Sequence, residues 1–326
     1  MNSVILSALS FILVFLTTLL IEKRIIPLLS TRMSQPIYEG GPSWHMSKSG
    51  TPTMGGLAFL ISITVYLAVS SVILMLSKEM KPAYSLIISL LFCLGNSIIG
   101  IIDDLTKIKR KENAGLTPLQ KLIFQFALSV IFLMARRHFL GDSTLISVNH
   151  LNIDFGILYY PMAILLLLGI INCANLTDGV DGLASSVALA IGAAFLIIGG
   201  SAPDVSILSA ILMGGAAGFL IFNTHPAKIF MGDTGSLFLG SLSVCLAFSY
   251  GNPLVIILIG GVYVIEGVSV IMQVVIFKST GKRIFKMAPL HHHLEKCGIA
   301  EGHICAIAMG VTILLSATAI LILEMI

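Results

Sequence analysis

The stretch LAFLISITVYLAVSSVILML, residues 57–76, carries no charged side chain and predicts a membrane-spanning helix. A spanning helix needs roughly 20 apolar residues to cross about 30 Å of hydrocarbon. Runs of this kind recur along the whole chain. We predict ten transmembrane helices, at approximately 4–21, 57–76, 85–102, 119–135, 155–171, 183–200, 205–222, 235–250, 254–277 and 304–323.

The composition of the chain supports the same class. Hydrophobic residues make up 56% of the 326 residues and charged residues only 11%, and the mean hydropathy is +1.00. These values exclude an ordinary soluble domain. We therefore expect an all-α, polytopic integral membrane protein, a single domain over residues 1–326. The first run is followed at once by Glu22, Lys23 and Arg24, which favours a retained helix over a signal peptide.

The distribution of positive charge predicts the orientation. Most of the 19 lysines and arginines lie in the loops after the odd-numbered runs. By the positive-inside rule these loops face the cytoplasm and both termini face outside. The five cysteines show no paired spacing, so we expect neither disulfides nor a cysteine metal site.

The polar motifs fall in the same odd-numbered loops, in or directly beside residues 22–56, 103–118, 172–182, 223–234 and 278–303. They read GGPSWHMSKSGTPTMGG, DDLTKIKRK, NCANLTDGVDG, FNTHPAKIFMGDTG and KMAPLHHHLEK. Five segments separated by membrane crossings thus converge on one face. Chance could place one acidic pair beside a helix end, but it explains all five poorly.

Several motifs have a purely structural interpretation. Asp103 and Lys107, four residues apart, fit a helix-surface ion pair. The pair Asp178 and Asp181 fits helix N-caps, as does Asp233. Asn223 fits a C-terminal cap.

The aromatic and histidine residues also have structural alternatives. Trp44 and Tyr38 fit aromatic anchors at the lipid surface, and Phe230 fits a packing residue. Adjacent histidines on a helix diverge by about 100° each, so His291–His293 make a poor single-metal cluster. Glu266 lies inside the ninth run beside Gly267, where an ionisable group usually faces protein or a cavity. It is consistent with a broken or bent helix rather than with chemistry.

The residue types suit a polyanionic substrate. Several aspartates can hold Mg²⁺, which prefers a few carboxylates together with phosphate oxygens and water. Lys48, Lys107 and the histidines can contact further phosphate oxygens. Phosphoryl transfer from a nucleotide diphosphate is the function that this combination favours. The sequence contains no Walker loop and no kinase signature, which disfavours ATP hydrolysis.

Taken together, HMSKSGTPTMGG, GIIDDLTK, NLTDGVDGLA, FNTHPAKIFMGDTGS and MAPLHHHLEKCG resemble the phospho-N-acetylmuramoyl-pentapeptide transferase (MraY) family of the polyprenyl-phosphate N-acetylhexosamine-1-phosphate transferase superfamily. The resemblance spans residues 45–298. It implies a bacterial plasma-membrane enzyme that uses UDP-N-acetylmuramoyl-pentapeptide and undecaprenyl phosphate to make lipid I and UMP with Mg²⁺. It also implies contact with membrane lipid, a homodimer and no nucleic acid polymer as partner.

The resemblance also implies roles for single residues. It makes Asp233 the Mg²⁺ ligand and, with Asp103, Asp104, His291 and His292, a catalytic residue. It implies a broken ninth helix beside a lipid groove, with Phe230 stacking on uracil. The expected substrate-binding residues are Lys48, Lys107, Asn172, Asn175, Asp178, Gly179, Asp181, Asn223, Phe230 and His293.

Three alternative functions remain at this point. A sibling transferase would take UDP-N-acetylglucosamine, but APLHHHLE favours the muramoyl substrate. An ion-coupled transporter would place ionisable groups near the bilayer midplane, whereas only Glu266 lies deep. A non-catalytic scaffold would leave the acidic, amide and basic groups without a purpose.

Overall fold

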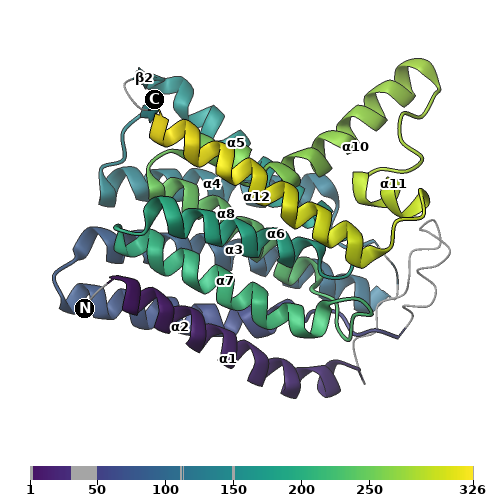
Figure 1. The fold of residues 1–326 in the computed structure, drawn as a ribbon, viewed down its shortest axis with the longest axis horizontal. Helices are drawn as coiled ribbons and strands as arrows, with labels where there is room; N and C mark the ends of the chain where they lie inside the picture. The colour runs from purple at the N-terminus through teal and green to yellow at the C-terminus, as the bar shows by residue number, and fades with distance from the viewer. Residues whose placement is uncertain (1–2, 31–49, 111, 113, 149–150, 326) are drawn as a thin grey trace.

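The computed structural model describes residues 3–30, 50–110, 112, 114–148 and 151–325. Its helices run mostly along one direction and form a bundle, with both termini at one end and α11 at the other (Figure 1). The long elements are α1 (Ser3–Ser30), α2 (Gly56–Leu76), α3 (Met80–Arg110), α4 (Pro118–Leu140), α5 (Tyr159–Thr177), α6 (Leu183–Gly199), α7 (Pro203–Asn223), α8 (Gly232–Tyr250), α10 (Gly261–Thr280) and α12 (Glu301–Met325). The short helices are α9 (Ile256–Ile259) and α11 (Leu290–Lys296).

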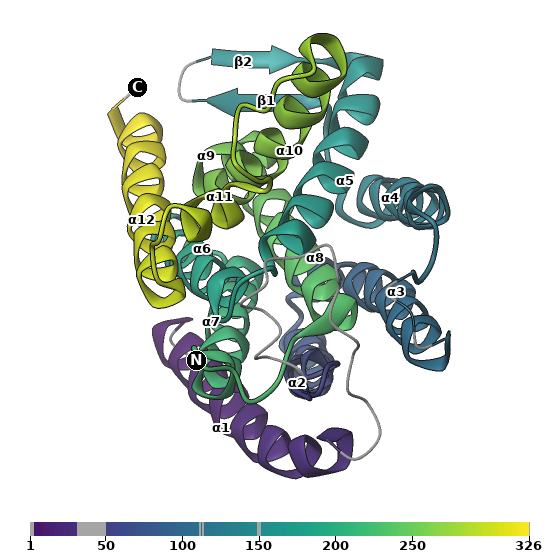
Figure 2. The same cartoon turned by 90° about the vertical axis from the view of Figure 1, so that its right-hand side faces the viewer.

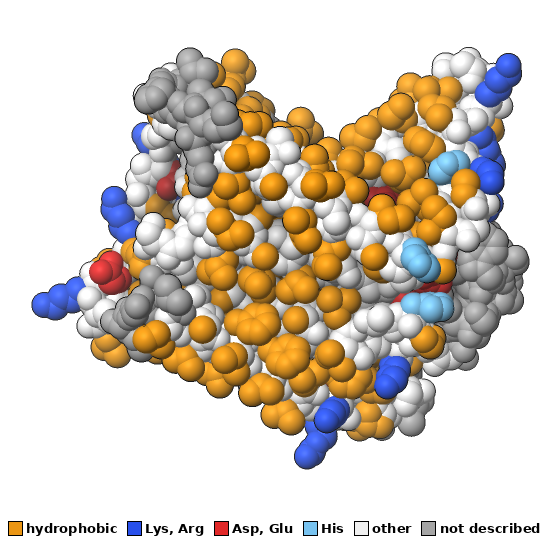
Figure 3. Space-filling view, in the orientation of Figure 1, with side chains coloured by type: hydrophobic (Ala, Val, Ile, Leu, Met, Phe, Trp, Pro, Cys, Tyr) orange, Lys and Arg blue, Asp and Glu red, His pale blue; other side chains and the backbone are white. Residues whose placement is uncertain are grey.

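Each predicted apolar run corresponds to helical structure, so the all-α class is confirmed. Within the described residues, 8 helices are long and apolar enough to cross a membrane. Hydrophobic side chains cover the middle of the molecule, while lysines and arginines gather toward its ends (Figure 3). This distribution is what a protein embedded in a bilayer requires. The number of ten spans and the outside location of the termini stay predictions.

The central helix, α8, lies among α2, α3, α5, α6 and α7 (Figure 2). It is buried from Thr234 to Phe248. Its serines satisfy their hydroxyls locally: Ser241 donates to Leu237 O at 2.7 Å, and Ser243 to Leu239 O at 2.8 Å. Small residues allow close helix packing inside a membrane bundle. Hydropathy alone therefore understates how deeply this helix lies.

Local sequence sets the ends of α4. Thr117 and Gln120 form a reciprocal capping box, and Pro118 occupies the first turn. Both features stabilise a helix start. Gly141 ends the helix in the left-handed conformation, with φ 74°, which glycine adopts without a steric penalty. The helix therefore begins just before Lys121, whose position is important below.

The ninth predicted run is broken, as expected. α9 ends at Ile259, Gly260 follows, and α10 begins at Gly261. From this break α10 leaves the bundle at an angle (Figure 1). The structure also contains a feature that we did not predict, an antiparallel hairpin of β1 (Leu145–Val148) and β2 (Leu151–Asp154).

Candidate active site

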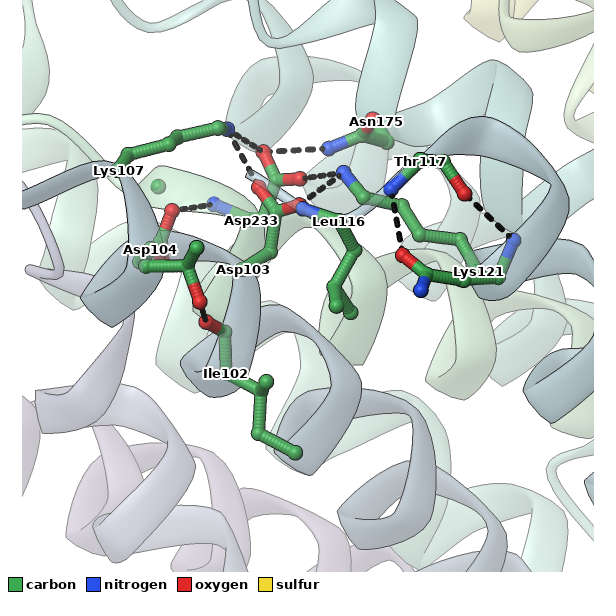
Figure 4. A network of polar contacts seen from close by, with 12 residues as sticks. Ile102, Asp103, Asp104, Lys107, Leu116, Thr117, Lys121, Asn175 and Asp233 are labelled. Carbon is green, nitrogen blue, oxygen red and sulfur yellow. Dashed lines mark hydrogen bonds and ion pairs between the residues drawn. The ribbon is translucent and has the colours of Figure 1, made fainter. Parts of the chain in front are cut away.

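An ion-paired cluster joins α3, α4 and α8 (Figure 4). Lys107 Nζ lies 2.6 Å from Asp103 Oδ2 and 3.3 Å from Asp233 Oδ1. Lys121 Nζ lies 2.9 Å from Asp103 Oδ1 and 2.5 Å from Asp233 Oδ2. Each carboxylate thus contacts both ammonium groups. Asp103 is fully buried, so the interpretation of Asp103 and Lys107 as a mere surface pair is wrong.

Sequence reasoning missed Lys121. This residue lies in α4, inside a predicted apolar run rather than in a loop. A signal was nevertheless present, because an ionisable residue within a spanning segment usually faces the protein interior and often serves a function. The structure brings Lys121 to both Asp103 and Asp233, so we add it to the candidate site.

Asp104 has different partners from its neighbour Asp103, because its carboxylate contacts the start of α8. Its carboxylate accepts hydrogen bonds from Asp233 N–H at 3.1 Å, Thr234 N–H at 2.8 Å and the Thr234 hydroxyl at 2.7 Å. Asp104 therefore caps the start of α8 from outside that helix. A Cβ added at Gly100, one turn earlier on α3, would lie 2.3 Å from Asp233 O. Only glycine permits this approach of α3 to α8.

α5 contributes Asn175 to the same cluster. Its Nδ2 donates to Asp233 Oδ1 at 3.2 Å and to Ser236 Oγ at 2.7 Å. Asp178 follows directly after α5. Burial, and after it the negative charges of Asp233, Asp104 and Asp181, raises the pKa of the Asp178 carboxyl well above its usual range. Three predicted acidic motifs, from loops far apart in sequence, therefore share one electrostatic environment.

Asp181 and Asn223 lie in a second polar group. Asp181 Oδ2 accepts from Ala227 N–H at 3.1 Å and lies 3.0 Å from His225 Nδ1. Asn223 Oδ1 accepts from Gly182 N–H at 2.9 Å. The N-cap of α6 is Gly182 with no side-chain cap bond. The interpretation of Asp178 and Asp181 as caps of α6 is therefore wrong.

Two further cap interpretations are wrong for the same kind of reason. The N-cap residue of α8 is Met231, which makes no side-chain cap bond, and Asp233 lies in the first turn. The C-cap of α7 is Thr224 rather than Asn223. Asn223 instead donates through Nδ2 to Ile229 O at 2.9 Å. Its amide thus ties the end of α7 to the segments that precede α6 and α8.

The histidine run forms α11. His291 is fully buried, with its Nδ1 3.1 Å from Glu266 Oε2. His292 Nδ1 lies 2.6 Å from Glu295 Oε2. His293 Nδ1 accepts from Lys286 N–H at 3.1 Å. Glu266 therefore does more than mark a helix break, because it contacts a predicted catalytic residue.

The remaining predicted residues have separate surroundings. Asn172 Nδ2 donates to Gln125 Oε1 at 2.8 Å, toward α4. Phe230 N–H donates to Pro52 O at 2.8 Å, and its ring is half-buried. Gly179 lies against the His291 ring. Lys48 lies outside the described residues, as do Tyr38 and Trp44. Substrate contacts of all these residues stay predictions.

Two groups in the described part of the chain have a geometry that could hold a metal ion. Within each group the possible ligand atoms lie within 4.8 Å of one another. The first group is Asp103, Asp104 and Asp233, and the second is Asp181, His225 and Glu301. The first group offers only carboxylate oxygens, which suit a hard cation such as Mg²⁺. Asp104 is already committed to three hydrogen bonds with α8. Asp233 and Asp103 are paired mainly with lysines, which a cation could replace.

A helical bundle of membrane-spanning type with a buried carboxylate and lysine cluster is an arrangement suited to an intramembrane transferase that acts on phosphorylated substrates. Residues 85–251 match the family model described as Glycosyl transferase family 4. Residues 48–60 match phospho-N-acetylmuramoyl-pentapeptide-transferase signature 1.

Three curated relatives extend this similarity over nearly the whole chain, and each is named phospho-N-acetylmuramoyl-pentapeptide-transferase. The relative from Halalkalibacterium halodurans is 44% identical, over 96% of this chain and 96% of its own length. The Bacillus subtilis (strain 168) relative is 42% identical, over 94% and 95%. The Clostridium botulinum (strain Eklund 17B) relative is 40% identical, over 97% and 95%. The chain belongs to the phospho-N-acetylmuramoyl-pentapeptide-transferase family.

Proposed function

We propose that this protein transfers phospho-N-acetylmuramoyl-pentapeptide from its UDP carrier to undecaprenyl phosphate, forming lipid I and UMP. The observation that carries the proposal is the contact of Asp233 with two lysines from two other helices. Such a cluster can neutralise and align phosphate groups. Relatives 40% to 44% identical bear the name of this activity.

The carboxylates of the cluster fit Mg²⁺. Asp233 would hold the ion, with Asp103 close enough to assist. When bound, the ion supplies charge neutralisation at the reacting phosphates. Lys107 and Lys121, which form ion pairs with the same carboxylates, would then be free to contact phosphate oxygens.

The surroundings of the two neighbouring aspartates favour direct attack by the acceptor. Asp103 is held by two lysines, and Asp104 by three donors of α8. Neither carboxylate is poised as a nucleophile. An oxygen of undecaprenyl phosphate would form the new bond to the phosphorus next to the sugar. The bond from that phosphorus to the bridging oxygen breaks, and UMP leaves.

A donor comparison tests the proposed function. Purified protein in detergent, with undecaprenyl phosphate and Mg²⁺, should form lipid-linked product from UDP-N-acetylmuramoyl-pentapeptide and not from UDP-N-acetylglucosamine. UMP and the lipid product should appear in equal amounts. Transfer from UDP-N-acetylglucosamine alone would instead support the sibling transferase, and transfer from neither donor would contradict both.

The orientation is a further part of the proposal: the cluster lies on the cytoplasmic side of the plasma membrane. We also propose that the protein is a homodimer. Positive charge in the odd-numbered loops supports this orientation. In a background without its five cysteines, Thr106→Cys and Lys296→Cys should be protected from an impermeant thiol reagent in intact cells. Ser201→Cys, between α6 and α7, is the control that should react. Labelling of Thr106→Cys and Lys296→Cys but not of Ser201→Cys would contradict the orientation. A monomeric mass of the purified protein in detergent would contradict the homodimer.

A further inference from the structure

Glu266 is a buried carboxylate on α10 with a specific partner on α11. Its side chain is 5% exposed and that of His291 is 0% exposed. Glu266 Oε2 accepts from the His291 backbone N–H at 3.3 Å and lies 3.1 Å from His291 Nδ1. An ionised carboxylate can only accept hydrogen bonds. The hydrogen of a neutral His291 ring therefore belongs on Nδ1.

This arrangement leaves the other ring nitrogen, Nε2, with a lone pair. Nε2 is buried and has no hydrogen-bond partner among the described residues. It lies against the backbone of Gly179, where an added Cβ would be only 2.3 Å away. Gly179 follows Asp178, which shares the electrostatic environment of the acidic cluster. A buried polar atom without a partner calls for an explanation, and a bound substrate group is one.

The three consecutive histidines differ in what fixes their rings. Glu295, which contacts His292, belongs to α11 itself. His293 uses its Nδ1 lone pair to accept the Lys286 N–H, so its hydrogen belongs on Nε2. His291 is oriented by a side chain of another helix, Glu266 of α10, which lies beyond the break at Gly260.

We propose that Glu266 is the positioning residue of His291, fixing the ring so that an unprotonated Nε2 lies beside Gly179, in the segment expected to bind substrate. This inference rests on the proposed transferase function. In it, His291 accepts a hydrogen bond from a hydroxyl of the substrate. It does not donate to a phosphate oxygen. The carboxylate and histidine pair thus gives the broken helix a direct part in the site.

Nitrogen NMR of the full-length protein in detergent tests the positioning without any substrate. With ¹⁵N-labelled histidine, the His291 signals are those lost in His291→Gln. We expect Nε2 of His291 to show the shift of an unprotonated ring nitrogen. In Glu266→Gln that signal should disappear or move, because an amide can also donate to Nδ1. A protonated Nε2 in the unmodified protein would overturn the proposal.

Kinetics test whether the reaction uses this positioning. Glu266→Gln should lower kcat by about 10- to 100-fold, a loss of the size found when the carboxylate partner of a metal-bound histidine is removed, and should change KM for the nucleotide by less than about twofold. Glu22→Gln is the matched control, because Glu22 is also a buried glutamate, but its carboxylate oxygens have no hydrogen-bond partner in the described part of the chain. It should change neither the His291 signals nor kcat.

The outcomes separate the two proposals. Loss of activity in Glu266→Gln with unchanged His291 signals would mean a structural role and refute the positioning. Changed signals with unchanged kcat would refute its use in the reaction. If the unmodified protein transferred neither sugar phosphate, the proposed function would fail, while the NMR result would still decide the orientation of His291.

Discussion

Asp104 of α3 and Thr234 of α8 form the contact that fixes the start of the central helix. Asp104 Oδ2 accepts from both the backbone N–H and the hydroxyl of Thr234, at 2.8 and 2.7 Å. Asp233, the residue before Thr234, carries the carboxylate that contacts both lysines. The position of the candidate metal ligand thus depends on a hydrogen-bonded cap supplied by another helix.

The first prediction concerns this cap. Asp104→Ala should lower the free energy of unfolding by about 3 kcal/mol, because it leaves buried donors of α8 without an acceptor. Thr234→Val removes only the hydroxyl and should cost about 1 kcal/mol. Unfolding in mixed micelles with increasing SDS measures both. Equal costs for the two variants would show that the backbone donors do not depend on Asp104.

A second prediction concerns Asp233. Asp233→Asn should leave the protein folded in detergent but abolish transfer, because an amide oxygen is a weaker ligand without charge. Turnover at several Mg²⁺ concentrations measures the effect. Asp154→Asn, in the exposed hairpin, is the control and should behave like the unmodified protein. Near-normal turnover of Asp233→Asn with an intact Mg²⁺ dependence would contradict the assignment.

Lys121 gives the third prediction. Lys121→Met should reduce kcat by about 100- to 1,000-fold, the loss expected when one preorganised donor to a developing charge is removed. Lys109→Met, an exposed lysine on the last turn of α3, is the matched control. Steady-state assays with both substrates saturating measure kcat. Similar rates for both variants would exclude Lys121 from the site.

The fourth prediction follows from the raised pKa of Asp178. An acid whose pKa is higher in the folded than in the unfolded state makes the free energy of unfolding depend on pH. This free energy is highest below the unfolded pKa of about 3.9 and decreases as the pH rises above that value. Asp178→Asn removes this loss because the amide does not ionise. The melting temperature of the variant should therefore exceed that of the unmodified protein increasingly as the pH rises from about 4. A difference that stays constant with pH would argue against a neutral Asp178.

The last prediction concerns the order of bond making. Direct attack requires both substrates at once, so enzyme, Mg²⁺ and the nucleotide sugar without undecaprenyl phosphate should release no burst of UMP. At pH 7 the acceptor phosphate is already largely ionised, because its second pKa is about 6. Rapid-quench measurement of UMP tests this. A burst equal to the enzyme concentration, with sugar phosphate trapped on Asp103 or Asp104, would establish a two-step route.

The fold could be predicted from sequence because hydrocarbon thickness sets the length of each apolar run. The break before α10 could also be predicted, from Gly260 and Gly261 and from the family resemblance. The hairpin of β1 and β2 was not, since its short strands mix polar and apolar residues. The central place of α8 was hidden for a related reason. Its serines lower the hydropathy, although their hydroxyls donate to leucine carbonyls one turn earlier in the same helix.

The sequence pointed to most residues of the candidate site, though not to Lys121, and it did not predict their contacts. Motif position placed Asp103, Asp233 and Asn175 on one face, and the structure joins them. Sequence spacing describes neighbours only within one helix. It therefore gave no sign that Asp104 would cap a different helix or that Glu266 would contact His291. These pairings depend on tertiary packing across many membrane crossings.

The balance of the Asp103, Asp233, Lys107 and Lys121 cluster has a consequence for biogenesis. Two negative and two positive groups compensate one another inside the bundle, so each lysine serves as a built-in counter-ion. Uncompensated carboxylates in such surroundings would be costly. A newly inserted chain can therefore complete its folding in the bilayer before it meets any divalent cation. We therefore expect assembly not to require a metal ion, with the proposed Mg²⁺ dependence confined to the transfer reaction.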